Sequence, residues 1–156
     1  MTEEKIEQSA LELLAGLGWQ VLHGPDIGPD GVVGEREFRD VVLTERLRQV
    51  LTRINPRIPT PKIDEALRRL VQVSKPNLLE NNHEFHQLLV NGVPVEYRTA
   101  SGETKHDIVR VIDTVNVRNN EFVAINQLTI IQGDCNRRPD IVLFVNGLPV
   151  VVIELK

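Results

Sequence analysis

The first half of the chain carries apolar residues at helical spacing. Residues 3–17 place Ile6, Leu11 and Leu14 on one broad stripe, and Thr2 precedes them as a suitable N-cap. Asparagine, proline and glycine interrupt the later apolar runs and indicate where helices end. The elements predicted for this half are a helix over residues 3–17, a strand over 19–22, a loop over 24–34, and helices over 44–54, 62–73 and 77–90.

The second half changes to short runs rich in β-branched residues, which predict strands. Residues 150–153 are apolar at four successive positions, the pattern of a strand covered on both faces. The predicted strands cover residues 93–98, 106–112, 121–131, 141–145 and 150–155. Together the two halves predict an α/β fold, with a mixed sheet flanked by helices and an amino-terminal helical portion.

Length and composition fit one globular domain. The 156 residues are 41% hydrophobic and 26% charged, and no apolar run reaches the roughly 18 residues that a membrane helix needs. The acidic amino terminus and the single cysteine, Cys135, give no sign of export or of a disulfide framework, so we expect a cytoplasmic protein without a membrane partner. The net charge of -4 argues against a protein that coats nucleic acid by bulk electrostatics.

Residues 138–156 carry the candidate chemistry. They predict a strand, a turn at Asn146-Gly147 and a second strand. Because positions in a hairpin pair about its turn, Asp140 lies opposite either Ile153 or Glu154, depending on the length of the loop.

A three-residue loop over residues 146–148 puts Asp140 directly across from Glu154. Lys156 then shares their face, because side chains alternate along a strand. Two carboxylates suit a hard cation such as Mg²⁺, which keeps sites for water and phosphate. Asp140 and Glu154 would hold this metal, with the Leu155 carbonyl as a backbone ligand. Lys156 would orient the attacking water and stabilise the negative charge that develops during phosphodiester hydrolysis.

The three site residues alone do not decide between this chemistry and chance. Pro-Asp followed at a distance by Glu-x-Lys recurs by accident in many proteins. The setting favours function, because Glu154 and Lys156 end an otherwise apolar strand and are costly to bury unless paired or bound to a metal. From the residues, both interpretations stay open.

At these positions the sequence resembles the PD-(D/E)xK nuclease superfamily, and specifically the R subunit of type I restriction-modification enzymes. The similarity is not confined to residues 138–156. It extends to residues 39–47, 53–56, 82–93 and 119–128. Because it spans nearly the whole chain, it is more specific than three catalytic positions.

The resemblance implies a restriction-endonuclease-like fold and a type I site-specific deoxyribonuclease. Such a subunit cuts unmodified foreign duplex DNA after ATP-driven translocation, with Mg²⁺ as cofactor and Mn²⁺ as a substitute. The implied partners are duplex DNA and the modification and specificity subunits. Residues 1–156 contain no phosphate-binding loop, so ATP would act only through motor domains absent from this chain. We therefore expect an amino-terminal endonuclease domain truncated just after the Glu-x-Lys motif, whose activity alone is open.

Three further residues are candidates. Glu7 matches an acidic residue of the family that would reach the metal, although a solvated helix glutamate is the alternative. Arg137 and Arg138 flank Asp140 and are candidates for contact with DNA phosphates, although exposed arginines are common on protein surfaces. The alternative function is a non-catalytic module that positions DNA or docks subunits, which the acidic net charge favours.

Overall fold

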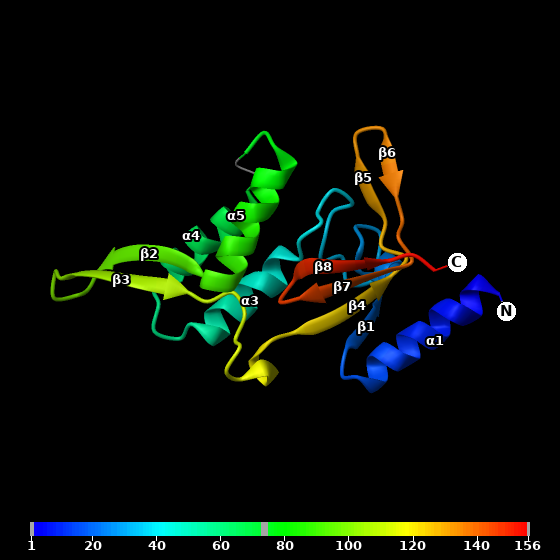
Figure 1. Ribbon diagram of the computed structural model, residues 1–156, viewed down its shortest axis with the longest axis horizontal. Helices are drawn as coiled ribbons and strands as arrows, with labels where there is room; N and C mark the ends of the chain where they lie inside the picture. The colour runs from blue at the N-terminus through cyan, green and yellow to red at the C-terminus, as the bar shows by residue number, and fades with distance from the viewer. Residues whose placement is uncertain (1, 73–74, 156) are drawn as a thin grey trace. The chain divides into compact units, whose positions relative to one another are not determined.

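A mixed four-stranded sheet carries the candidate site. Its strands, in spatial order, are β1 (Gln20–His23), β4 (Phe122–Asn126), β7 (Ile141–Val145) and β8 (Leu148–Ile153) (Figure 1). Strands β1 and β4 run parallel, whereas β4, β7 and β8 are antiparallel neighbours. The sheet therefore brings the amino-terminal segment next to a segment about a hundred residues later in the chain.

The computed structural model describes residues 2–72 and 75–155. The chain forms two compact units, one from residues 1–45 with 121–156 and one from residues 46–120. The assignment of residues 1–156 to a single endonuclease domain stays a prediction. Within the described ranges, no helix combines the length and the apolar character that crossing a membrane requires.

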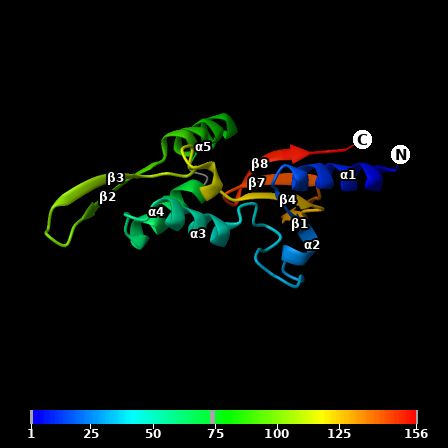
Figure 2. The ribbon, with the colours of Figure 1, turned by 90° about the horizontal axis from the view of Figure 1, so that it is seen from below.

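The two faces of the sheet are covered by different segments (Figure 2). Helix α1 (Glu3–Gly16) packs on the face that carries Ile141 and Leu143 of β7. The opposite face packs against Ile27 of the short helix α2 (Gly24–Ile27) and the residues around it. The core of this second face consists of Ile27, Leu43, Val123, Ile125, Leu128, Val142 and Phe144. Successive side chains of the central strands β4 and β7 therefore point alternately into the two apolar layers, because side chains alternate between the faces of a strand.

The unit of residues 46–120 combines helices with a hairpin. Its helices are α3 (Thr44–Ile54, which begins just before the unit), α4 (Thr60–Val71) and α5 (Leu78–Asn91), followed by β2 (Val93–Arg98), β3 (Thr104–Val109) and the 3₁₀ turn η1 (Val117–Asn119). Asn77 caps α5, because its side chain accepts a hydrogen bond from the Leu79 amide. The buried Asn55 side chain pairs with both backbone groups of Arg110, at 2.9 Å each, and so ties the end of α3 to the segment after β3.

The α/β class is confirmed, and the predicted helices and strands occur in the predicted order. The loop predicted over residues 24–34 is wrong at its start, because Gly24–Ile27 form the short helix α2. One long predicted strand, residues 121–131, is wrong, because β4 ends at Asn126 and a separate strand, β5 (Ile130–Gln132), follows. The break occurs at Gln127, whose φ of 52° lies in the left-handed region and cannot continue an extended strand. Strand β5 pairs with β6 (Cys135–Arg137), a strand that the sequence did not predict.

Strand β8 is not covered on both faces, contrary to its apolar pattern. It is the last strand in the order of the sheet and pairs only with β7 among the described strands. Val150, Val151 and Val152 remain 41%, 45% and 62% exposed. The apolar run was therefore a correct signal for a strand and a wrong signal for its burial.

Asp113, in the loop after β3, makes the stability of the fold depend on pH. Asp113 accepts hydrogen bonds from the backbone amides of Asn116 (2.9 Å) and Val115 (3.1 Å) and from the Asn119 side chain (2.8 Å). These bonds, the Asn116 amide first, hold the pKa of the Asp113 carboxyl below its usual range. A lowered pKa in the folded state stabilises the fold above the unfolded pKa of about 3.9, and this stability is lost as the pH falls.

We therefore expect the free energy of unfolding of residues 46–120 to fall on acidification, and to fall less steeply in Asp113→Asn. Asparagine keeps the shape and loses the titrating group. Urea unfolding of both proteins at several pH values between about 3 and 6 measures the two slopes. Parallel pH dependence in the two proteins would show that Asp113 contributes nothing to it.

Candidate active site

The turn between β7 and β8 has two residues, not three. Val145 pairs with Leu148, which leaves only Asn146 and Gly147 in the loop. Both have positive φ, 55° and 82°, as a type I′ hairpin turn requires. Asn146 is further fixed to the start of β4, because its side chain accepts from the Glu121 amide at 2.7 Å. The sequence left the length of this loop open, and the three-residue loop that would put Asp140 directly across from Glu154 is not the one that forms.

A bulge in β8 compensates for the shorter loop. Phe144 pairs with Pro149 and Leu143 with Val151, so Val150 is an extra residue on this strand. Beyond the bulge Ile141 faces Ile153. If this register continues by one residue, Asp140 comes opposite Glu154. A two-residue turn with a bulge produces this pairing, in place of a three-residue loop without one.

Asp140 lies against the chain segment that carries the other candidate ligands. Its Oδ2 accepts a 2.6 Å hydrogen bond from the Leu155 amide, and its backbone carbonyl accepts from the Gln127 amide at 3.0 Å. Asp140 is half-buried and Glu154 is exposed. Leu155 packs with the α1 face of the core, so the backbone next to Glu154 is anchored. Lys156, the third expected catalytic residue, lies outside the described residues.

Glu7 of α1 reaches the same edge of the sheet. Its two carboxylate oxygens accept hydrogen bonds from the side-chain amides of Asn126 and Gln127, each at 2.7 Å. Asn126 also bonds to the His23 ring nitrogen Nδ1 at 3.0 Å. Since β1 and β4 are parallel, His23 and Asn126 both end their strands at this edge. The alternative of a merely solvated Glu7 is therefore wrong, while its role as a metal ligand stays a prediction.

Sequence reasoning missed His23, Asn126 and Gln127. The available signal was the polar residue that ends each of two apolar strands, because the carboxyl ends of parallel strands meet at one edge. Without knowing that β1 pairs with β4, however, the two ends could not be brought together.

A groove of about 1020 Å³ runs along this edge. Its lining includes four carboxylates, from Glu3, Glu4, Glu7 and Asp140. Two cationic side chains, Lys5 and Arg138, line it as well, so negative groups are in excess. Within residues 2–72 and 75–155, no three His, Cys, Asp or Glu side chains group as a metal-binding cluster. The groove is thus an acidic surface suited to attract cations.

Comparisons with known proteins agree on one family. Residues 1–156 match the family described as type I restriction enzyme R protein N terminus. The chain is 39% identical over 158 residues to the type I restriction enzyme HindI endonuclease subunit of Haemophilus influenzae. It is 31% identical over 155 residues to a Methanocaldococcus jannaschii protein provisionally named as the type I restriction enzyme MjaIXP endonuclease subunit. These matches cover 100% and 97% of this chain but only 15% of each relative's length.

The bonds of Glu7 generate a stability prediction. Glu7→Ala removes the acceptor for two partly buried amide donors, and we expect it to lower the free energy of unfolding by roughly 1–2 kcal/mol. Glu12→Ala on the same helix is the matched control. Within the described part of the chain Glu12 accepts only an exposed hydrogen bond, from Gln8, so its loss should cost a few tenths of a kcal/mol. Urea unfolding measures both losses, and equal losses would contradict the tie between α1 and β4.

Proposed function

The chain belongs to the family of the type I restriction enzyme R protein N terminus, and from that membership we propose that it is a metal-dependent DNA endonuclease. The observation that supports this most is the contact of the Asp140 carboxylate with the Leu155 amide, next to Glu154, at the end of a rigid hairpin. In this proposal the sheet is a PD-(D/E)xK nuclease core, and Asp140, Glu154 and Lys156 are its catalytic residues.

The groups at this end of the hairpin fit a hard divalent cation. Asp140, Glu154 and the Leu155 carbonyl offer only oxygen donors, which Mg²⁺ prefers and Mn²⁺ accepts. Among the described residues, Asp140 Oδ1 accepts no hydrogen bond, so one carboxylate oxygen is available while Oδ2 is held by Leu155. Glu7 is a further candidate ligand. The absence of a larger described cluster is compatible with Mg²⁺, which binds through few carboxylates and keeps much of its water.

When bound, such a cation polarises the phosphate and offsets the negative charge that develops during hydrolysis. The protein's own contribution is orientation. The Leu155 amide fixes the rotation of the Asp140 carboxylate, and the type I′ turn and bulge fix the opposite strand. Lys156 holds the attacking water by a hydrogen bond and stabilises the phosphorane-like transition state. The water oxygen forms a bond to phosphorus and releases a proton to the solvent, while the bond from phosphorus to the 3′ oxygen breaks and that oxygen takes up a proton from the solvent to leave as a hydroxyl.

The wider setting is also part of the proposal. The substrate is unmodified foreign duplex DNA in the cytoplasm, and the partners are the modification and specificity subunits of a restriction complex. ATP-driven translocation belongs to motor domains in sequence other than residues 1–156. Two observations favour a second candidate, a non-catalytic positioning or docking module: the chain has a net charge of -4, and the groove is acidic.

Asp140→Asn separates these two functions. Asparagine still offers an oxygen to the Leu155 amide, so the hairpin should stay intact while a ligand charge is lost. In the R subunit assembled with its partner subunits, we expect plasmid cleavage to fall by roughly 100-fold or more and translocation to continue at the wild-type rate. A substituted complex that both translocates and cuts normally would show that the catalytic assignment is wrong.

Metal binding is testable without cleavage. With Mg²⁺ at ten times its dissociation constant, the stabilisation is about 1.4 kcal/mol, which slows amide exchange limited by local opening about tenfold. We expect this slowing in peptides that cover residues 140–155 of the R subunit, at millimolar metal, measured by hydrogen–deuterium exchange. Glu154→Gln keeps the shape and removes a ligand charge, so it should abolish the slowing. An identical response to Mg²⁺ in wild type and Glu154→Gln would refute this site.

A further inference from the structure

The hairpin of β5 and β6 stands beside the candidate active site. It connects the end of β4 to the start of β7, so it rises from the edge of the sheet where Asp140 lies (Figure 1). Every residue from Gln132 to Arg138 is exposed. The hairpin adds little to the core of its unit, and its outer part is available to a partner.

Two arginines of this hairpin have no partner among the described residues. Arg137 ends β6 and Arg138 follows it, and successive residues of an extended segment point to opposite sides. Arg138 lines the acidic groove together with Asp140. Neither guanidinium has a hydrogen bond or ion pair with any residue that the structure describes. The other arginines of the same unit are engaged, Arg36 by backbone carbonyls and Arg39 by Asp40 at 4.0 Å.

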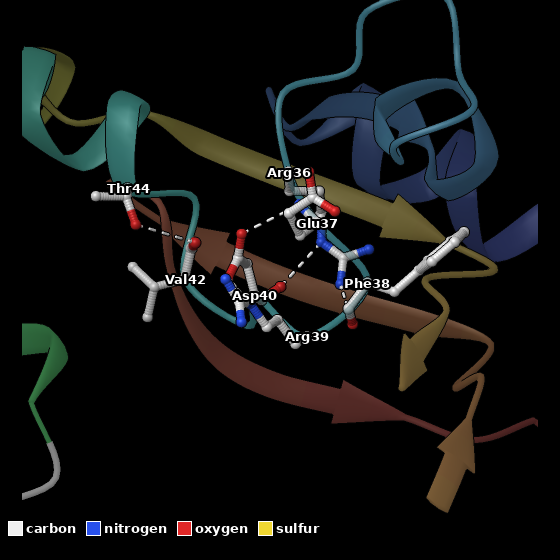
Figure 3. Close-up of polar contacts among 7 residues, drawn as sticks. All are labelled: Arg36, Glu37, Phe38, Arg39, Asp40, Val42 and Thr44. Carbon is white, nitrogen blue, oxygen red and sulfur yellow. Dashed lines mark hydrogen bonds and ion pairs between the residues drawn. The ribbon is translucent and has the colours of Figure 1, made fainter. Parts of the chain in front are cut away.

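The root of the hairpin is fixed by a buried arginine, Arg36, whose contacts within residues 36–40 are drawn in Figure 3. Arg36 is only 4% exposed, and it donates to the carbonyl oxygens of Asp40 (2.9 Å), Thr129 (2.9 Å) and Phe38 (3.1 Å). The Phe38 carbonyl also accepts from the Ile131 amide of β5 at 3.0 Å. Burial lowers the pKa of the Arg36 guanidinium, against the attraction of Asp40. Thr129 and Ile131, at the start of the arm, are therefore held to residues 36–40.

Positive charge on the hairpin would offset the repulsion between the acidic groove and DNA phosphates. Carboxylates outnumber cationic groups along the groove, and a DNA phosphate approaching it meets like charge. A guanidinium binds a phosphate through two parallel hydrogen bonds, which gives orientation as well as attraction. A two-stranded ribbon is also narrow enough to enter the major groove of duplex DNA.

We infer that the β5–β6 hairpin is a DNA-gripping arm, an inference that rests on the proposed endonuclease function. Arg138 holds the backbone phosphate nearest Asp140, and Arg137, on the other side of the ribbon, holds a second phosphate further along the duplex. Arg36 is a positioning residue that keeps the arm at a fixed angle to the site. The contacts are to phosphates, so the arm grips DNA without regard to its sequence.

The test uses the R subunit in its assembled complex. We expect the double variant R137A/R138A to lower the cleavage rate at least about tenfold at physiological salt while translocation is unchanged. The slope of log rate against log salt should decrease by about two, one for each lost phosphate contact. Arg39→Ala is the control for a general charge effect, because it removes one positive charge, against two in the double variant, from the same unit at a side chain that already pairs with Asp40.

Arg36→Gln tests the positioning role. We expect faster exchange of the Ile131 amide and slower cleavage, whereas the amides of β4 and β7 keep their protection, since they bond within the central sheet. If Arg36→Gln instead unfolds the whole unit, the double arginine variant still decides the question, because both of its residues are exposed.

Two results would contradict the inference that the β5–β6 hairpin binds DNA. One is a double variant that cuts at the wild-type rate with the wild-type salt slope, and the other is an equal loss in Arg39→Ala, which would indicate a general charge effect. Asp140→Asn run in parallel distinguishes the failures. An inactive Asp140→Asn beside a fully active double variant refutes the arm alone, whereas a fully active Asp140→Asn refutes the proposed nuclease itself.

Discussion

The register of β8 on β7 is the constraint on which the rest of the site depends. In a strand that packs on two sides, a slip of one residue exchanges every side chain between the two faces. Ile141 and Leu143 must face α1 while Val142 and Phe144 face the layer around Ile27, so β7 has no freedom to slip. The type I′ turn alone would give one pairing, and the bulge at Val150 adds the one residue that changes it. Core packing thus fixes β7, and the two-residue turn with the bulge at Val150 determines which residue of β8 comes opposite Asp140.

Polar groups gather where this core ends. Strands β1 and β4 stop at the same edge, and Gln127 leaves the sheet in a left-handed conformation. Gly24 permits that exit, because a Cβ atom there would lie 2.5 Å from the Gln127 carbonyl oxygen. Glu7 then satisfies the amides of Asn126 and Gln127. A left-handed backbone and half-buried amides without partners are costly, and here hydrogen bonds from these amides to Glu7 offset that cost and orient the edge around Asp140.

The arrangement of charge shows how an acidic chain can bind the acidic substrate that we propose for it. Burying the Arg36 guanidinium is unfavourable, yet three carbonyl acceptors compensate it and no positive charge is left for an external ligand. Arg137 and Arg138, by contrast, are exposed and without described partners at the candidate site. Net charge is therefore a poor guide for this protein, since the position of a few cations matters more than their sum.

The amino-acid pattern was enough to predict the four long helices and the turn at Asn146-Gly147, and it narrowed the residue opposite Asp140 to Ile153 or Glu154. These depend on local periodicity and on residues that are near one another in the chain. Tertiary structure alone decided the contacts of Glu7 with Asn126 and Gln127, which join positions 119 and 120 residues apart. It also decided the exposure of β8 and the end of β4 at Asn126, against the local pattern. Such features follow from which strands become neighbours, and propensity within a short window carries no information about that choice.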